Sequence, residues 1–384
     1  MSAVRTGGTE FDLLCQATRP QTDLTRVRDL LRGKIDHSFL AALALGHGVQ
    51  PRLFRCLDHL CWEGVPEAEQ HSQQLFRQDH LVRTLMLADE LRHVAAAFDE
   101  RGVAFTAFKG PALAITLYGN LADREYNDLD LLVPEDRVDD AEDVLASLGY
   151  HPPQGHRAFR RAFLGHLRQN TFRREGSPTA IDLHWDFSGA HVPFPLRTAD
   201  VWSDLAHMSI GDRDIATISG ANLALLLAGH GTKEAWKLLK WVGDFAWMID
   251  RHRDLDWLDI HRRALAQRCG DALLLGCGMA HELLDIAPPD ELAGIVERND
   301  RVLARTALLS GRMRAGILPS LEGENFADLD LCDRRIDRIK GALRLAFTPT
   351  PGDYAALKLP PALWGAYYIT RPCRLALRAI KGIG

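Results

Sequence analysis

The chain has 384 residues, of which 46% are hydrophobic and 25% are charged, and its formal net charge is −5. This length is enough for two or three units with cores of their own, and the composition is that of an ordinary globular protein. The slightly acidic balance argues against a polymerase that acts on long nucleic acid, because such proteins usually carry a basic surface.

The cysteines and the N-terminal residues indicate a compartment. Seven cysteines are present, an odd number, and none of them forms a CxxC pair. This usage is typical of reduced thiols in a cytosolic protein. The N-terminal residues lack the apolar run of a signal peptide, and no stretch of about 18 apolar residues suggests a membrane span. We therefore expect a cytoplasmic protein.

Residues 1–100 are expected to form a helical N-terminal region. Apolar residues recur at spacings of three and four, first in short segments and then in a long pattern over 71–99 that ends at Gly102. This long helix leads directly into the first predicted strand. We therefore expect it to pack against a sheet.

The next segment predicts a strand, a glycine turn, a helix and a second strand. Val103–Phe108 is short, β-branched and aromatic, as buried strands are. Gly110 breaks this strand, and Pro111 stands where a first helical residue belongs. Asp128–Val133 is expected to form the second strand.

Asp128 and Asp130 lie on one face of that second strand. Alternate side chains of a strand share a face, so their Cα atoms are about 7 Å apart. Two carboxylates this close repel one another unless a cation lies between them. Mg²⁺ favours such oxygen ligands together with substrate phosphate oxygens. The free N–H groups at the Gly110 helix start would attract an anion, so the segment predicts a nucleoside triphosphate site.

A third acidic strand is predicted over residues 179–187. Apolar residues alternate there with Asp182, His184 and Asp186, which is typical of a half-buried strand whose polar side chains face outward. Asp182 is flanked by apolar residues on both sides. We therefore expect Asp182 to complete the site.

Two charged segments lie between these strands. The helix predicted over 135–147 is acidic, and we interpret its acids as a solvated face. Residues 159–175 are expected to form two strands of a meander. The arginines of this part of the chain have two interpretations, a clamp for phosphate or acceptor, or exposed positions on edge strands. They are Arg157, Arg160, Arg161, Arg168, Arg173 and Arg174.

A helical pair is predicted over residues 219–251. On its second helix Lys233, Lys237, Lys240 and Asp244 fall on one face. This face could hold the triphosphate or the base, or it could be a solvated face with a Lys240–Asp244 pair. His230 is interpreted as a capping or core histidine, with a catalytic role as the alternative.

The C-terminal part of the chain carries a basic helical pattern. Residues 254–347 predict helices without a site signal, and after them Arg371, Arg374, Arg378 and Lys381 share a helical face. Residues 364–384 could contact an anionic membrane surface or a partner. The alternative is a terminal helix that packs on its own domain.

The motifs of the chain follow one another in the order Lys109 and Gly110, a helix, an arginine, the sequence NDLDLLV and a later IDLHW strand. In the order of these motifs the chain resembles the uncharacterised nucleotidyltransferase-like family of the DNA polymerase β superfamily. The resemblance covers most of the chain. It implies metal-dependent transfer of a nucleotidyl group, with Asp128 and Asp130 as paired metal ligands and Asp182 as the third carboxylate. The usual Gly-Ser of the first helix turn is Lys109 and Gly110 here. The serine contact to phosphate is therefore absent, and Lys109 would replace it as a point charge.

We expect an α+β fold with a small mixed sheet. The predicted segments are a helical N-terminal region (1–100), a nucleotidyltransferase-like core (101–190), a helical domain (191–349) and a C-terminal tail with an amphipathic basic helix (350–384). The expected function is transfer of a nucleotidyl group from a nucleoside triphosphate to a small-molecule or peptide acceptor in a biosynthetic pathway. A non-catalytic nucleotide-binding or regulatory module and phosphoryl transfer are the alternatives.

The predicted site has two groups of residues. The metal, Mg²⁺ or Mn²⁺, is expected at Asp128, Asp130 and Asp182. Arg124 is expected either to contact phosphate or to brace Asp128 through a bidentate pair. The residues expected to bind the nucleotide are Lys109, Gly110, Arg124, Lys233 and Lys240.

Overall fold

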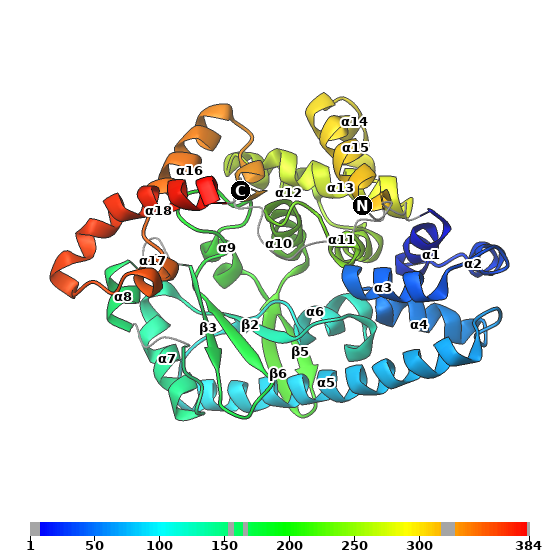
Figure 1. Ribbon diagram of the computed structural model, residues 1–384, viewed down its shortest axis with the longest axis horizontal. Coiled ribbons are helices and arrows are strands. Elements are labelled where there is room, and N and C mark those ends of the chain that lie inside the picture. Colours follow the sequence, from blue (N-terminus) through cyan, green and yellow to red (C-terminus); the bar gives the residue numbers. More distant parts are fainter. Residues whose placement is uncertain (1–7, 153–156, 164–167, 316–326, 382–384) are drawn as a thin grey trace.

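A six-stranded mixed sheet lies at the centre of the protein (Figure 1). The computed structural model describes residues 8–152, 157–163, 168–315 and 327–381. The strands are β1 (Thr106–Ala107), β2 (Asp128–Leu132), β3 (Gln169–Arg173), β4 (Ala180–His184), β5 (Leu205–Ile210) and β6 (Arg213–Ile218). Their order is β3-β4-β2-β1-β6-β5. β2 pairs with β4, and β1 with β6, in parallel, whereas the other neighbours are antiparallel. The expected α+β fold is confirmed.

The long helix α5 (Glu67–Glu100) covers one face of the sheet (Figure 1). Its side chains Leu91 and Val94 share a buried core with Leu129 and Leu131 of β2. Burial of such side chains stabilises the fold by about 1.5 to 3 kcal/mol each. The prediction that the long helix packs against a sheet is therefore confirmed.

The opposite face of the sheet meets a second, larger core made by helices from both ends of the described chain. Phe108, which follows β1, and Leu132 of β2 belong to it, as do side chains of α1, α10 and α13. The helices before the sheet are α1 (Gly8–Thr18), α2 (Leu24–Leu31), α3 (His37–His47) and α4 (Gln50–His59), and those after it are α10 (Gly220–Lys233), α11 (Leu239–Arg251), α12 (Trp257–Ala266), α13 (Gly270–Leu284), α14 (Asp290–Glu297) and α15 (Asp300–Arg314).

The remaining helices are short or lie at the C-terminal end. They are α6 (Pro111–Leu113), a π-helix (Ala114–Tyr118), α7 (Val138–Ser147), α8 (Arg157–Ala162), α9 (Thr198–Ser203), α16 (Arg335–Phe347), α17 (Pro351–Ala356) and α18 (Tyr367–Lys381), with 3₁₀ turns at Leu121–Asp123, Glu135–Arg137, Ala327–Leu331 and Pro361–Ala366. Within the part of the chain that the structure describes, no helix is both long and apolar enough to cross a membrane.

The sequence patterns missed two strands. β5 and β6 form a hairpin that extends the sheet beside β1, although residues 191–349 were expected to be helical throughout. The first strand is also shorter than predicted, since only Thr106–Ala107 of the expected stretch pairs with its neighbours. The segment boundaries at residues 100, 190 and 349 stay predictions.

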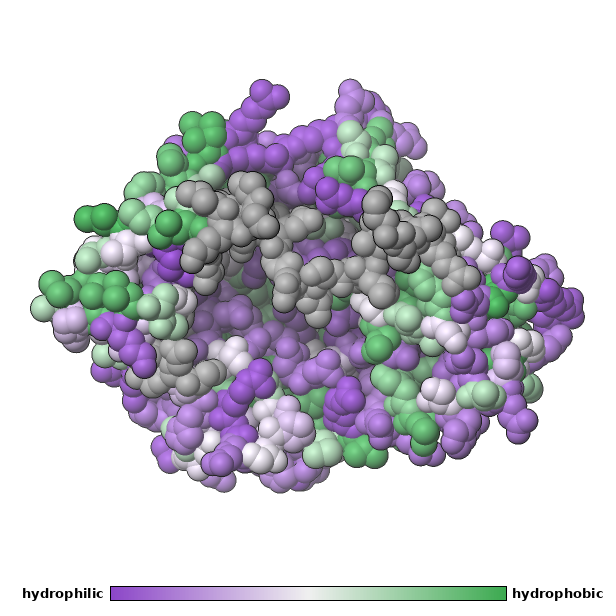
Figure 2. All heavy atoms as spheres, viewed as in Figure 1, coloured by the Kyte–Doolittle hydropathy of each residue, from purple (hydrophilic) through white to green (hydrophobic). Residues whose placement is uncertain are grey.

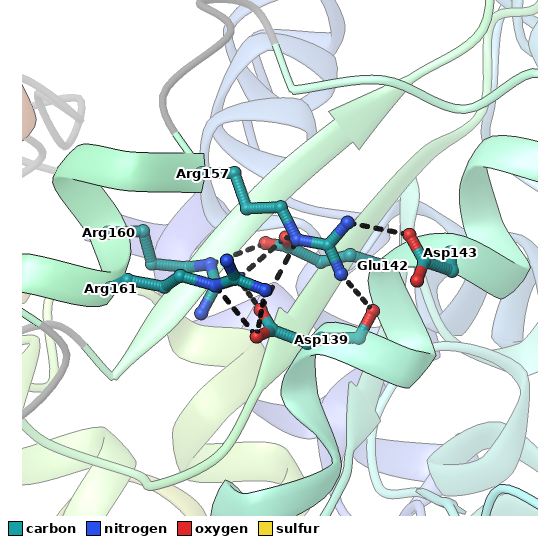
Figure 3. A network of polar contacts seen from close by, with 6 residues as sticks. All are labelled: Asp139, Glu142, Asp143, Arg157, Arg160 and Arg161. Carbon is teal, nitrogen blue, oxygen red and sulfur yellow. Dashed lines mark hydrogen bonds and ion pairs between the residues drawn. The ribbon is translucent and has the colours of Figure 1, made fainter.

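The arginine-rich segment begins with a helix and not with the strand that was predicted. In α8 the spacing of Arg157, Arg160 and Arg161 turns their side chains toward α7 (Figure 3). The guanidinium of Arg157 lies 2.7 Å from an oxygen of Asp143, and that of Arg161 lies 2.6 Å from an oxygen of Asp139.

This network corrects two interpretations. Arg160 lies 2.6 Å from Glu142 and also pairs with Asp139. Asp139, Glu142 and Asp143 of α7 are therefore partners of the α8 arginines, and these ion pairs hold the two short helices together. Asp140 and Asp143 are exposed to solvent, as predicted. The three arginines of α8 are accordingly engaged with protein carboxylates.

Candidate active site

The register of β2 and β4 brings the three predicted aspartates together. The two strands are parallel, and Asp130 lies directly opposite Asp182. Asp128 lies two residues before Asp130, on the same face of β2. All three line one cavity of about 310 Å³. The expectation that the three aspartates share one cleft is therefore confirmed. The divalent cation expected between them stays a prediction.

His184 joins this group, although the sequence analysis gave it no role. It lies two residues after Asp182 on β4, so the strand alternation places both on one face. Oxygens of Asp130 and Asp182 and a ring nitrogen of His184 lie within 4.8 Å of one another. The signal was present in the IDLHW alternation that selected Asp182.

Asp130 is the most enclosed carboxylate of the group. It is 6% exposed, and its Oδ1 lies 3.1 Å from Nε2 of His184, whose N–H donates to it, and 3.5 Å from the ammonium of Lys109. Burial alone would raise the pKa of Asp130, but the Lys109 charge and the His184 hydrogen bond outweigh it and lower this pKa. Asp130 is therefore ionised at every physiological pH.

Asp128 has the opposite electrostatic environment. Burial, followed by the negative charges of Asp130 and Asp182, raises the pKa of Asp128 to about 6. Lys109 and Lys240 reduce this rise without cancelling it. At Asp128, therefore, burial and the two like charges outweigh the attraction of the two lysines.

Gly110 is required by the close approach of two backbone segments. Its φ is +54°, and a Cβ at this position would lie 2.8 Å from the carbonyl oxygen of Asp128. A larger residue would push the turn away from the start of β2. Pro111 follows as the first residue of α6, and the helical segment ends before Gly119, whose φ is +71°. The predicted glycine turn, proline start and helix stop are confirmed.

Arg124 forms the predicted kind of bond with a different partner. Its Nε and one terminal nitrogen each lie 2.9 Å from an oxygen of Asp244 on α11, and the hydroxyl of Tyr118 donates to Asp244 at 2.8 Å. The expectation that Arg124 braces Asp128 is wrong, because α11 brings a buried carboxylate to the guanidinium. Arg124 still lines the cavity.

The single basic helix predicted from Lys233 is interrupted. α10 ends at Lys233 and α11 begins at Leu239, with Trp236 between them at a φ of +49°. The ring of Trp236 occupies the space that a Cβ of Gly231 would fill, so packing favours a turn over a continuous helix. The prediction of one helical face was therefore wrong.

Lys233 and Lys240 nevertheless both line the cavity, from the end of one helix and the start of the next. The chain of Lys240 passes Gly48, where a Cβ would lie 2.7 Å from it, and burial lowers the pKa of Lys240. The predicted Lys240–Asp244 pair is absent among the described residues, because Asp244 is bound to Arg124. Lys240 thus offers an ammonium to the cavity.

Glu125 and Trp241, which the sequence did not single out, complete the cavity wall together with His230, for which a core and a catalytic role were both left open. The carboxyl of Glu125 is buried, one of its oxygens has no hydrogen-bond partner in the described part of the chain, and burial raises its pKa. His230 also lines the cavity, and its burial followed by the charge of Lys109 holds its pKa well below the usual range. The ring of Trp241 lies 5.3 Å from that of His230.

Residues 33–285 match the model of a family described as uncharacterised nucleotidyltransferases. The protein belongs to this family. The chain is also similar to the antibiotic-resistance factor ANT(2'')-Ia, in a solution structure (14% identity, 47% of this chain and 89% of that one, TM-score 0.34) and in a crystal structure with adenylyl-2''-tobramycin (16% identity, 47% and 96%, TM-score 0.34). No curated protein matches the chain.

The donor set of this nucleotidyltransferase fits a divalent cation. Asp130 and Asp182 present carboxylate oxygens within a few ångströms of one another. The ring nitrogen of His184 that lies beside them carries the hydrogen donated to Asp130, so the two carboxylates are the ligands in this arrangement. The other ring nitrogen of His184 is buried and has no partner among the described residues. Carboxylate oxygens of this kind suit Mg²⁺ and Mn²⁺.

Proposed function

We propose that the protein is a metal-dependent nucleotidyltransferase that moves a nucleotidyl group from a nucleoside triphosphate to a small-molecule or peptide acceptor. The observation that carries this proposal is the parallel register of β2 and β4, which sets Asp130 opposite Asp182 at the cavity. Family membership supports the reaction class. Mg²⁺ or Mn²⁺ would be held by Asp130 and Asp182, with Asp128 and His184 beside them.

The bound metal would supply charge neutralisation and a template for the phosphates. Lys109, Lys233 and Lys240 surround the carboxylates, and we assign them to the triphosphate as point charges. The Gly110 turn would present backbone N–H groups to the same phosphates. Catalysis would consist of positioning and of stabilising the charge that develops on the α-phosphate and on pyrophosphate.

Arg124 supports the proposed site without contacting the metal. Its bidentate pair with Asp244 ties the loop before β2 to α11, the helix that carries Lys240. This pair would keep Asp128 and Lys240 at a fixed separation, which is the kind of preorganisation that phosphoryl chemistry needs. We therefore assign Arg124 a positioning role, although it was expected to contact the nucleotide or Asp128.

One observation favours a second function, that of a non-catalytic nucleotide-binding module. Asp130 already has two protein partners, Lys109 and His184, which together offset its charge. A carboxylate stabilised in this way can persist without a metal. Asp128 and Asp182 argue for the enzyme, because a module without metal would gain nothing from two further acids that repel Asp130.

The test is incubation with each nucleoside triphosphate labelled at the α-phosphate, with Mg²⁺ or Mn²⁺ and a small-molecule extract. If the protein is a nucleotidyltransferase, we expect a labelled product and release of pyrophosphate. Both should be lost in Asp130→Asn and retained in Asp139→Asn. Release of a nucleoside diphosphate would indicate phosphoryl transfer. Metal-independent nucleotide binding that persists in Asp130→Asn, without any product, would indicate the module.

A further inference from the structure

Helix α16 presents a row of large apolar side chains to solvent. Ile336, Ile339, Leu343 and Phe347 follow one another at helical spacing, and Ile339 is 57% exposed. The opposite side of the helix is packed, since Gly341 lies against the backbone of His191. The exposed row is therefore one face of an anchored helix and not a frayed end.

Helix α18, which contacts α16, carries a second exposed apolar face. Ile369, Cys373 and Leu377 lie on one face at intervals of four residues, and Ile369 is 72% exposed. The other side of α18 packs inward, where the ring of Tyr367 lies 5.8 Å from that of Phe159. Hydrophobic residues gather in Figure 2 along the edge of the molecule where Figure 1 places α16 and α18.

The charge of this region is opposite to that of the whole chain. Residues 334–384 contain ten Lys and Arg but only two acids, whereas the complete chain has 46 Lys and Arg against 51 Asp and Glu. Both acids are neutralised internally. Asp337 lies 3.1 Å from Arg268, and Asp353 accepts hydrogen bonds from Arg371 and Arg374 at 2.8 Å.

Because Arg371 and Arg374 are bound to Asp353, the unpaired positive charge of this region lies on other residues. Arg371 and Arg374 were expected to form a basic face on the last helix, but they clamp Asp353. The side chains of Arg378 and Lys381 lie outside the described residues. The basic residues of this region without an ion-pair partner in the described chain lie mainly beside the apolar row of α16. They are Arg334, Arg335, Lys340 and Lys358.

We propose that α16 and α18 bind together to the surface of a membrane that contains anionic lipid. A helix with an apolar face flanked by Lys and Arg lies in the interface, where the apolar side chains enter the lipid and the basic groups reach the headgroups. Anionic lipid attracts each such basic group by about 1 kcal/mol. This docking extends beyond the transferase function and does not depend on it.

Charge selects lipid over a second copy of the chain. A symmetric dimer through this surface would place Arg335 and Lys340 of one copy beside the same residues of the other, with no free acid in the region to offset them. An anionic bilayer supplies both the apolar layer and the negative charge. The surface is thus complementary to lipid headgroups and not to itself.

Cosedimentation of the full chain with vesicles tests the proposal. We expect binding to vesicles of equal parts phosphatidylcholine and phosphatidylglycerol, weak binding to phosphatidylcholine alone, and loss of binding with added salt. The double variant Ile339→Asp/Leu343→Asp should lose binding. The control Leu81→Asp/Leu85→Asp, a matched exposed pair on α5, should retain it.

A milder variant separates charge from folding. Lys340→Gln should weaken binding to the anionic vesicles about fivefold, the equivalent of about 1 kcal/mol, whereas Lys34→Gln should leave it unchanged. Equal binding to both kinds of vesicle, binding by the α16 double variant, or no binding at all would overturn the proposal. A dimer in sedimentation velocity that disappears in the α16 double variant would also overturn it, in favour of a second copy.

Discussion

Two groups of carboxylates in this protein lie in contrasting surroundings. On α7 the acids Asp139, Glu142 and Asp143 face three arginines of α8, and every charge has a partner (Figure 3). On β2 and β4 three aspartates share one lysine and one histidine at close range. The acids of the first group are paired within the chain, whereas Asp128 and Asp182 of the second group form no ion pair among the described residues.

Under the proposed function, this difference separates a structural acid cluster from the metal-binding one. Burial acts to raise the pKa of Asp139, but the hydrogen bonds and charge of the α8 arginines together lower it, whereas burial and like charges raise the pKa of Asp128. The local sequence pattern distinguished the two clusters, but it did not identify the arginine partners of the α7 acids. In the structure the clusters differ in whether a distant segment supplies the matching positive charge.

Removal of one acid from each cluster should give the largest contrast in activity. Asp130→Asn is expected to lower nucleotidyl transfer about 10³-fold, because it removes the most buried proposed metal ligand. Asp139→Asn should leave the rate within about twofold. The measurement is the rate of label transfer from the α-phosphate. Comparable losses in the two variants would erase the distinction between the clusters.

A second variant tests why Arg124 does not neutralise the cavity acids. Asp244→Asn should destabilise the protein by about 3 to 5 kcal/mol in urea unfolding, because it leaves the buried Arg124 without its partner. The double variant Arg124→Met/Asp244→Leu should recover much of this loss. A loss below about 1 kcal/mol for Asp244→Asn would show that Arg124 is free to pair elsewhere.

Neutralising one acid of each cluster should change the stability of the protein at neutral pH in opposite directions. The pKa of Asp128 is raised to about 6 in the folded protein, so ionisation of this carboxyl destabilises the fold as pH rises from its pKa in the unfolded chain to about 6. In metal-free buffer at neutral pH, Asp128→Asn removes this charge and should therefore stabilise the protein by about 1 to 2 kcal/mol. Asp139 has a lowered pKa, which stabilises the fold above the unfolded value, so Asp139→Asn should destabilise it. Changes of the same sign in chemical denaturation would contradict the comparison.

Metal affinity should depend on pH through Asp128. Below a pH of about 6 a proton occupies this carboxyl, so each further unit of acidity should weaken Mg²⁺ binding by at most about tenfold. Above that pH the affinity should be nearly constant, and in Asp128→Asn the dependence should be much reduced. Calorimetric titration with Mg²⁺ measures both. A wild-type affinity that is flat between pH 5 and 7 would remove Asp128 from the site.

Much of the site was predictable because its determinants are local. The alternation in β2 and β4 placed Asp128 and Asp130 on one face of their strand and Asp182 on the polar face of the other, and Gly110 with Pro111 marked the turn into the helix. These features depend on strand periodicity and on backbone geometry, which neighbouring residues decide.

The features that the sequence did not predict depend on contacts between distant segments. Nothing near Arg124 in the sequence identifies Asp244, which lies 120 residues away, as its partner. The break after Lys233 arises where Trp236 packs on Gly231, and the helix at Arg157 depends on the acids of α7. Such choices are made by tertiary packing, which overrides the local pattern.

The most direct test of the central claim is the position of Mn²⁺ in crystals soaked with it, located by anomalous diffraction. We expect a peak between the carboxylates of Asp130 and Asp182, within bonding distance of both, and none beside the acids of α7. Absence of metal from the cavity at saturating Mn²⁺, or a peak at Asp139 instead, would contradict the assignment of β2 and β4 as the metal-binding strands.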